Sequence, residues 1–127
     1  MREEIIDAYD AAWNEADAAA RVHQLERSLS DDAELIDPTG HYRGRAAVAD
    51  RIAGFGERFP GARVTITSGV DAHHGFARYS WRITGSDGST LLEGIDVVEQ
   101  SEHDERLRRV VMFFGALPPA LDSLARG

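Results

Sequence analysis

The chain changes its hydrophobic period near its middle, and this change limits the folds that it can adopt. Apolar residues recur at helical spacing over residues 3–14, 17–29 and 45–58, with a short extended segment at 33–37. From residue 63 onward they alternate with polar residues, over 63–72, 76–84, 90–99 and 107–114. Alternation of this kind indicates a sheet with one covered face. Helices followed by strands therefore predict an α+β fold, with helices packed on one face of an antiparallel sheet.

Length and composition favour one ordinary globular domain. The 127 residues suit a single domain spanning 1–127, and an apolar share of 43% is enough for a packed core. There is no cysteine, which excludes disulfides and thiolate metal sites. The net charge of −8 disfavours nucleic acid as a partner, because phosphate contacts need a basic face. The acidic start and the lack of a long apolar stretch predict neither a signal peptide nor a membrane span, so we expect a cytoplasmic protein without a membrane partner.

Three polar residues lie where polar side chains are unusual. Tyr9 falls on the apolar stripe of the first helix, so its hydroxyl is expected to point inward and to need a partner. Asp96 lies in the middle of a strand on an apolar face, where burial would raise its pKa and favour the proton-donating form. Asp37 ends the short extended segment, before a loop at 38–44. Structural roles also remain open for them. Tyr9 could be a core tyrosine bonded to the backbone, Asp37 could only cap the turn at Pro38, and Asp96 could be a buried structural carboxylate.

The order of these residues resembles that of the ketosteroid isomerases. The resemblance is carried by Tyr9 with the following Ala-Ala-Trp-Asn, by Asp37-Pro38-Thr39-Gly40, by Ile95-Asp96 and by the closing strand Val110 to Gly115. Other stretches are more similar to the SnoaL-like group of the nuclear-transport-factor-two-like superfamily: Ala12-Trp13-Asn14, Tyr42-Arg43-Gly44-Arg45 and Glu93-Gly94-Ile95-Asp96. The likeness extends over nearly the whole chain.

This resemblance implies a cone-shaped, curved antiparallel sheet with three N-terminal helices on its concave face. It also implies catalytic roles for three residues. Asp37 would take a proton from a carbon next to a carbonyl, while Tyr9 and a protonated Asp96, in hydrogen-bond reach of each other, would stabilise the enolate oxygen. The substrate would be an apolar small molecule such as a steroid or polyketide ring, and no cofactor would be needed. The expected substrate-binding residues are Trp13, Val64, Ile66, Tyr79, Trp81, Val110, Met112 and Phe114.

Two other functions remain open. The pocket could bind an apolar ligand without catalysis, or the chain could be a SnoaL-like polyketide cyclase or a water-activating hydrolase. The hydrolase version of the fold uses an arginine between two aspartates, and Arg78 is expected to face outward, which argues against it. No metal is expected, because His73 and His74 are neighbours on an extended segment and point to opposite faces.

The face of the sheet away from the pocket also carries apolar residues. Val97, Val111 and Phe113 alternate outward on the last two strands. Pairing of two copies through this face would remove the apolar cluster from water, and the resemblance also favours a homodimer.

Overall fold

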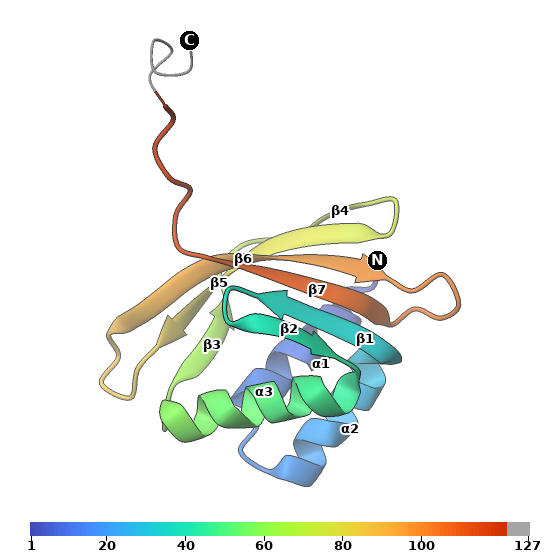
Figure 1. The fold of residues 1–127 in the computed structure, drawn as a ribbon, viewed down its shortest axis with the longest axis horizontal. Coiled ribbons are helices and arrows are strands. Elements are labelled where there is room, and N and C mark those ends of the chain that lie inside the picture. Colours follow the sequence, from blue (N-terminus) through green and yellow to red (C-terminus); the bar gives the residue numbers. More distant parts are fainter. Residues whose placement is uncertain (122–127) are drawn as a thin grey trace.

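A computed structural model describes residues 1–121 of the chain (Figure 1). Within this range three helices are present: α1 (Glu3–Asn14), α2 (Ala18–Ser28) and α3 (Arg45–Arg58). The strands are β1 (Leu29–Asp37), β2 (Gly40–Arg43), β3 (Arg63–Ile66), β4 (Asp71–His73), β5 (Phe76–Thr84), β6 (Thr90–Gln100) and β7 (Leu107–Phe114). None of the helices in residues 1–121 is long and apolar enough to cross a membrane.

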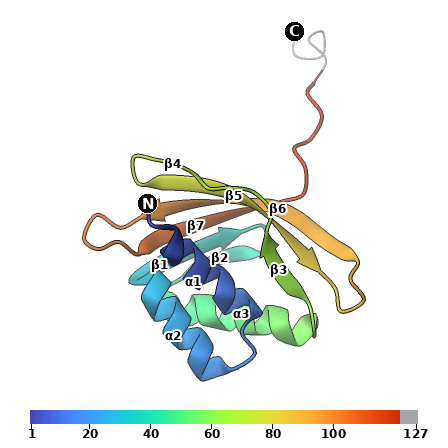
Figure 2. The ribbon, with the colours of Figure 1, turned by 180° about the vertical axis from the view of Figure 1, so that it is seen from behind.

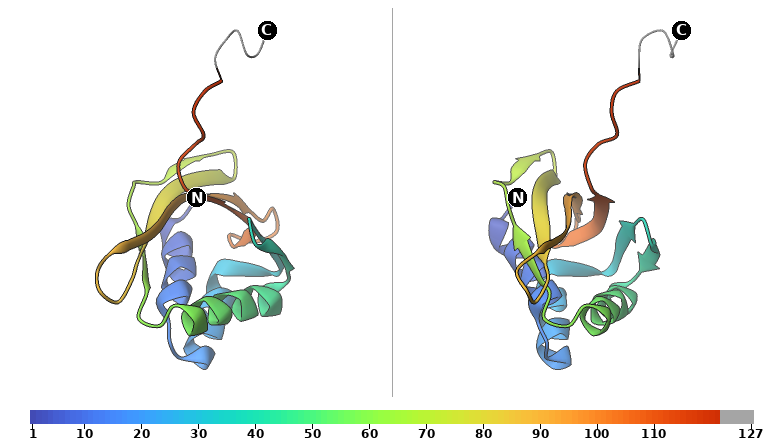
Figure 3. Two further views of the ribbon diagram at one scale, coloured as in Figure 1. Left: turned by 60° about the vertical axis from the view of Figure 1, so that its left-hand side comes forward. Right: turned by 90° about the vertical axis from the view of Figure 1, so that its left-hand side faces the viewer.

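The strands form one curved sheet that folds over the helices (Figures 2 and 3). The strand order is β2-β1-β7-β6-β5-β3, and β4 pairs with β5 beside β3. The α+β architecture expected from the sequence is confirmed. The sheet is mixed, because β1 runs parallel to β7 while the other pairs are antiparallel. The parallel pair arises because the last strand inserts between β6 and the early strand β1.

Two segments differ from the sequence-based expectation. Residues 40–43, expected in a loop, form β2, because the Asp37 carboxylate accepts the backbone N–H of Thr39 at 2.7 Å and turns the chain back onto β1. The long strand expected at 63–72 is divided into β3 and β4. Between these two strands, the hydroxyl of Ser68 accepts the backbone N–H of Ser80, so a side chain replaces part of the ladder with β5.

Helix α1 is fixed to the edge of the sheet by the side chain of Asn14. Its amide oxygen accepts the backbone N–H of Val64, and its amide nitrogen donates to the carbonyl oxygen of Val64, both at 2.8 Å. The amide therefore satisfies the free edge of β3 much as a further strand would. This contact fixes the position of the α1 face that carries Tyr9 and Trp13 against the concave side of the sheet.

Gly94 allows Trp81 to lie flat on the sheet. The two residues are cross-strand partners on β5 and β6. A Cβ atom at position 94 would lie 2.3 Å from Cζ2 of the indole and 2.2 Å from the carbonyl oxygen of Phe113, both far inside van der Waals contact. The indole therefore occupies the space that any other side chain at position 94 would need.

Gly94→Ala should lower the free energy of unfolding by about 3 kcal/mol, because both the indole and a backbone carbonyl would have to move. Urea denaturation measures this change. Gly56→Ala, in α3, is a matched control: its added methyl group meets open space, so it should stabilise the protein by about 0.5–1 kcal/mol. A Gly94→Ala variant as stable as the parent protein would show that the indole is not held against the glycine.

The convex face of the sheet carries an exposed apolar surface at its centre. Ile95 and Phe113 face each other across β6 and β7 and are 43% and 57% exposed, with the half-buried pair Val97 and Val111 beside them. Ion pairs on the same sheet, including Arg82 with Glu93 at 2.9 Å, surround this surface. An apolar centre with a charged rim is typical of a protein interface.

Two copies of the chain should pair through this convex surface, since pairing removes its apolar centre from water. Light scattering at micromolar concentration should give twice the chain mass. Phe113→Glu should give the monomer mass, whereas Val22→Glu, which changes another exposed apolar residue, on α2, should leave the dimer intact. A monomer mass for the unaltered protein would contradict the prediction.

Candidate functional site

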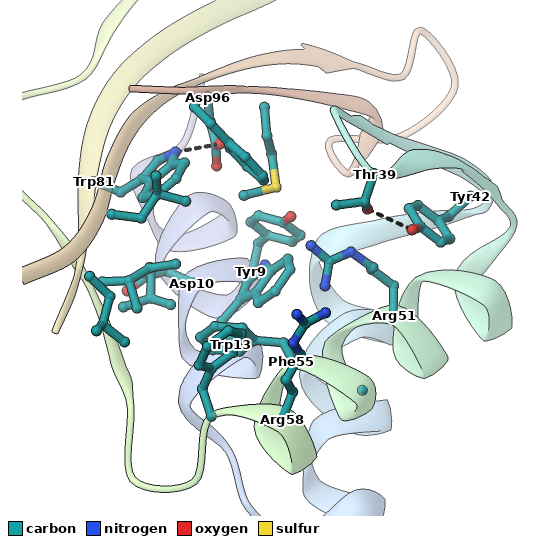
Figure 4. A pocket seen from close by; sticks show the side chains of 18 of the residues that line it. Tyr9, Asp10, Trp13, Thr39, Tyr42, Arg51, Phe55, Arg58, Trp81 and Asp96 are labelled. Carbon is teal, nitrogen blue, oxygen red and sulfur yellow. Dashed lines mark hydrogen bonds between the residues drawn. The ribbon is translucent and has the colours of Figure 1, made fainter. Parts of the chain in front are cut away.

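A pocket of about 940 Å³ lies between the concave face of the sheet and helices α1 and α3 (Figure 4). Of the residues proposed from the sequence, Tyr9, Trp13, Val64, Tyr79, Trp81, Asp96, Met112 and Phe114 line it. Helices and strands contribute opposite walls. At the outer end the wall is formed by exposed residues, among them Phe59 after α3 and Leu91 on β6.

Asp96 is the polar centre of the strand wall. The residue is 4% exposed. One carboxylate oxygen, Oδ1, accepts the indole N–H of Trp81 at 2.8 Å, and the other, Oδ2, accepts the hydroxyl of Tyr79 at 3.1 Å. Both donors come from β5, the neighbouring strand, so the sheet itself holds the carboxyl group against the pocket.

Burial raises the pKa of Asp96 to about 7. The hydrogen bonds from Tyr79 and Trp81 act in the opposite direction, since they stabilise the charged form, and the nearby Asp10 adds a smaller upward contribution. Near neutral pH, Asp96 is therefore present in both protonation states. It can accept a proton and return it, which is the property required of a general base that later acts as an acid.

Tyr9 is buried at 1% exposure, and its hydroxyl has no hydrogen-bond partner among the described residues. The hydrogen bond between Tyr9 and Asp96 that the resemblance implied is absent, and the donors to the Asp96 carboxylate are Tyr79 and Trp81 instead. Burial, reinforced by the charge of Asp96, raises the pKa of Tyr9 well above its ordinary value. The phenol therefore keeps its proton and is available as a donor in the middle of the pocket (Figure 4).

Asp37 does not line the pocket. Its side chain is fully buried, and its Oδ2 accepts Nε–H of Arg51 at 3.1 Å. The other oxygen accepts both the backbone N–H and the hydroxyl of Thr39. The expectation that Asp37, Asp96 and Tyr9 share one cavity therefore holds for the last two, because the Asp37 carboxylate is turned toward Arg51 instead.

Two of the expected apolar residues also lie outside the pocket wall. Val110 has the same orientation on β7 as Met112 but is 1% exposed and sealed in the core. Ile66, at the end of β3, packs against the same core and does not reach the cavity. Alternation gives the correct face in both cases, but it does not show where along a strand the helices stop covering it.

Several polar residues of the pocket were not expected from the sequence, above all Asp10 and Arg51. Asp10 lies one turn before Trp13 on α1, and burial, with a contribution from Asp7, raises its pKa to about 6. Arg51 extends from α3 toward Tyr9 (Figure 4). A signal for Arg51 is present in the sequence: small residues, Ala47 and Gly54, lie on the same helix face and leave room beside it.

The comparisons with known proteins agree with this architecture. The family model described as the SnoaL-like domain matches residues 6–110. Among solved structures, a candidate isomerase of the SnoaL-like family from Agrobacterium tumefaciens superposes with a TM-score of 0.83 at 32% sequence identity, covering 89% of this chain and 96% of that chain. A comparison with proteins of curated function finds no match.

Two more distant structures share the fold. A candidate polyketide cyclase from Sinorhizobium meliloti has 15% identity and a TM-score of 0.70, over 87% of this chain and 94% of that chain. A protein with a ketosteroid-isomerase-like fold from Catenulispora acidiphila, in complex with trimethylamine, has 17% identity and a TM-score of 0.71, over 89% and 86%.

The raised pKa of Asp96 predicts how stability depends on pH. The native state holds this proton more tightly than the unfolded chain, so a rise in pH from about 4 to about 7 favours unfolding and has no further effect above that range. The difference of about three pKa units corresponds to at most roughly 4 kcal/mol.

Asp96→Asn should therefore gain stability relative to the parent protein as the pH is raised from 4 to 8. An amide at this position can still accept from Trp81 and donate to the hydroxyl of Tyr79. Urea denaturation of both proteins at several pH values measures the difference, and the exposed Asp32→Asn serves as control. Parallel pH curves for the parent protein and Asp96→Asn would contradict a buried, proton-binding Asp96.

Proposed function

The chain belongs to the SnoaL-like domain family, and on this basis we propose that it is an enzyme that moves a proton next to the carbonyl group of an apolar ring substrate. The observation that carries the proposal is the Asp96 carboxyl group, buried in the wall of an apolar pocket with a pKa of about 7. Such a group is well matched to proton transfer at neutral pH.

In this proposal, ionised Asp96 removes the proton from the carbon next to the carbonyl. The electron pair of the broken C–H bond forms a double bond to the carbonyl carbon, and the π pair of the carbonyl group moves onto its oxygen, which produces an enolate. Asp96, now protonated, returns the proton to the enolate, at the same carbon or at a conjugated one. Trp81 and Tyr79 keep the carboxyl group in place through both steps, and the apolar walls formed by residues such as Phe114 hold the ring.

This assignment gives the proton-accepting role to Asp96 and not to Asp37. The side chain of Asp37 is fully buried and does not line the pocket, so a substrate carbon in the pocket does not reach its oxygens. Asp96, in contrast, lines the pocket. No cofactor takes part in the proposed step, because an aspartate base and a hydrogen-bonded enolate are sufficient for it.

Isomerisation and polyketide cyclisation share this first step, since a cyclase also forms its nucleophile by removing a proton next to a carbonyl. One assay therefore covers both reactions. Exchange of hydrogen for deuterium next to the carbonyl, followed by NMR in deuterated water, detects the step even when no stable product forms. Suitable compounds are enolisable cyclic ketones, such as 2-tetralone and a 3-oxo steroid.

The protein should accelerate this exchange, with a kcat/KM that rises with pH and levels off above about 7, because only ionised Asp96 accepts a proton. If Asp96 acted instead as the protonated donor, the rate would fall above the same pH. Asp96→Asn should lower the rate by about two orders of magnitude or more. Asp32→Asn, an exposed aspartate outside the pocket, should leave it unchanged.

Asp37→Asn separates the two assignments of the base. It should retain measurable exchange if Asp37 only holds Arg51, and it should abolish exchange if Asp37 is the base. Ketones that bind without any accelerated exchange would favour the alternative function, a pocket that binds apolar ligands without catalysis.

A further inference from the structure

Two hydrogen-bond donors face the pocket without an acceptor. The hydroxyl of Tyr9 is buried and unpaired among the described residues. Arg51 uses Nε–H for Asp37, and its terminal Nη groups have no acceptor within residues 1–121. A buried donor without a partner costs free energy, and this applies to the Tyr9 hydroxyl. The Nη groups of Arg51 belong to a residue that lines the pocket and are open to an acceptor. Both groups therefore fit a ligand that brings an acceptor.

Arg51 is held in one orientation by its neighbours. Its side chain is 17% exposed, and its Nε lies 3.1 Å from Oδ2 of Asp37. The guanidinium carbon lies 5.6 Å from the ring centre of Trp13 and 5.8 Å from that of Tyr42. The Tyr42 hydroxyl is in turn 2.7 Å from the hydroxyl of Thr39. The guanidinium is therefore fixed before any ligand arrives.

The ion pair between Arg51 and Asp37 is oriented with its positively charged group toward the pocket. Asp37 lies behind the pocket wall, while Arg51 is part of the wall. The pair is neutral in total, but it presents its positive end to the cavity. Figure 4 shows this end directed toward Tyr9, with Asp10 and Asp96 in other parts of the pocket.

We propose that Tyr9 and Arg51 form an anion subsite that binds a negatively charged oxygen of the substrate. The inference rests on the proposed function, in which that oxygen is the enolate oxygen produced when Asp96 removes the proton. The positive end of the ion pair between Arg51 and Asp37, which is directed into the pocket, stabilises an enolate more than the neutral carbonyl from which it forms. Tyr9 contributes a hydroxyl that keeps its proton, and Arg51 contributes the Nη groups in a planar fork.

The subsite changes what the resemblance implied for two residues, Tyr9 and Asp37. Tyr9 remains a donor, but its partner in binding the oxygen is Arg51 instead of Asp96. Asp37 becomes a positioning residue, since it touches Arg51 and not the substrate. The substrate class follows from this arrangement: a ring compound with a carbonyl that can become an enolate, for which a ring carboxylate is a stable charged analogue.

The test compares the binding of two ligands of nearly the same shape, 2-naphthoate and the neutral 2-naphthamide, by calorimetry. The Asp96→Asn protein is included, because it removes the charge of Asp96 from the comparison. Naphthoate should bind about tenfold or more tightly than naphthamide in both proteins, since hydrogen bonds to a charged group are the stronger ones.

Arg51→Met should remove this preference while leaving naphthamide binding nearly unchanged. Because the variant leaves Asp37 buried without its partner, the double variant Arg51→Met with Asp37→Asn is measured as well. Tyr9→Phe should reduce the preference by about three- to tenfold, because the bond from its hydroxyl to the charged ligand is stronger than the bond to the neutral amide. Arg78→Met, at an exposed arginine on the far face of β5, is the matched control and should have no effect.

Asp37→Asn alone should reduce the ratio of the two affinities, whereas a purely structural role would weaken both ligands equally. Equal binding of naphthoate and naphthamide, or a preference that survives the double variant, would overturn the subsite. These outcomes are independent of the exchange assay. If exchange depends on Asp96 but naphthoate is not preferred, only the subsite is refuted. If the preference for naphthoate depends on Arg51 but no exchange is accelerated, only the proposed enzymatic function is refuted.

Discussion

The contact between the indole of Trp81 and Gly94 determines the shape of the pocket's strand wall. Because position 94 has no side chain, the indole lies along the sheet, and its N–H reaches Asp96 two residues further on β6. A carboxyl group in this apolar wall would be costly without such a donor. The sheet thus supplies both the low-polarity surroundings that raise the pKa and the hydrogen bonds that keep the charged form accessible. The proton chemistry of the site depends on this balance.

The helices complete the site from the opposite direction. Asn14 fixes α1 to the edge of β3, which places Tyr9 in the cavity, and α3 brings Arg51 to the same space. The acid on the strand side and the donors on the helix side belong to different layers of the fold. Their separation is therefore set by how the helices pack on the sheet and not by any single loop. A pocket assembled in this way can hold a proton acceptor and a positive charge without the two neutralising each other.

The sequence predicts the layers of this fold better than the contacts of its polar groups. Alternation along β6 correctly places Asp96 on the inner face, since the period of a strand leaves only two choices. The same reasoning cannot find the partner of Asp96, because Trp81 and Tyr79 reach it through the register of β5 with β6. Asp37 illustrates the limit most clearly: its place after β1 was visible, but the direction of its carboxylate depends on Arg51, which comes from a helix 14 positions later. The parallel pairing of β1 with β7 is likewise set by packing between distant segments.

The outer end of the pocket is lined by exposed apolar residues, whereas its inner end is lined by buried ones. Phe59, the residue after α3, and Leu91, on a strand that follows a hairpin, are exposed there, whereas Asp96 and Tyr9 are buried. Substitutions at these positions change the size of the ligand that enters without disturbing Asp96 or its donors. Over evolutionary time, such a protein can change its substrate while its chemistry stays the same. Related chains are expected to diverge first at the mouth of the pocket, and the selectivity of each is then encoded in residues that contribute little to folding.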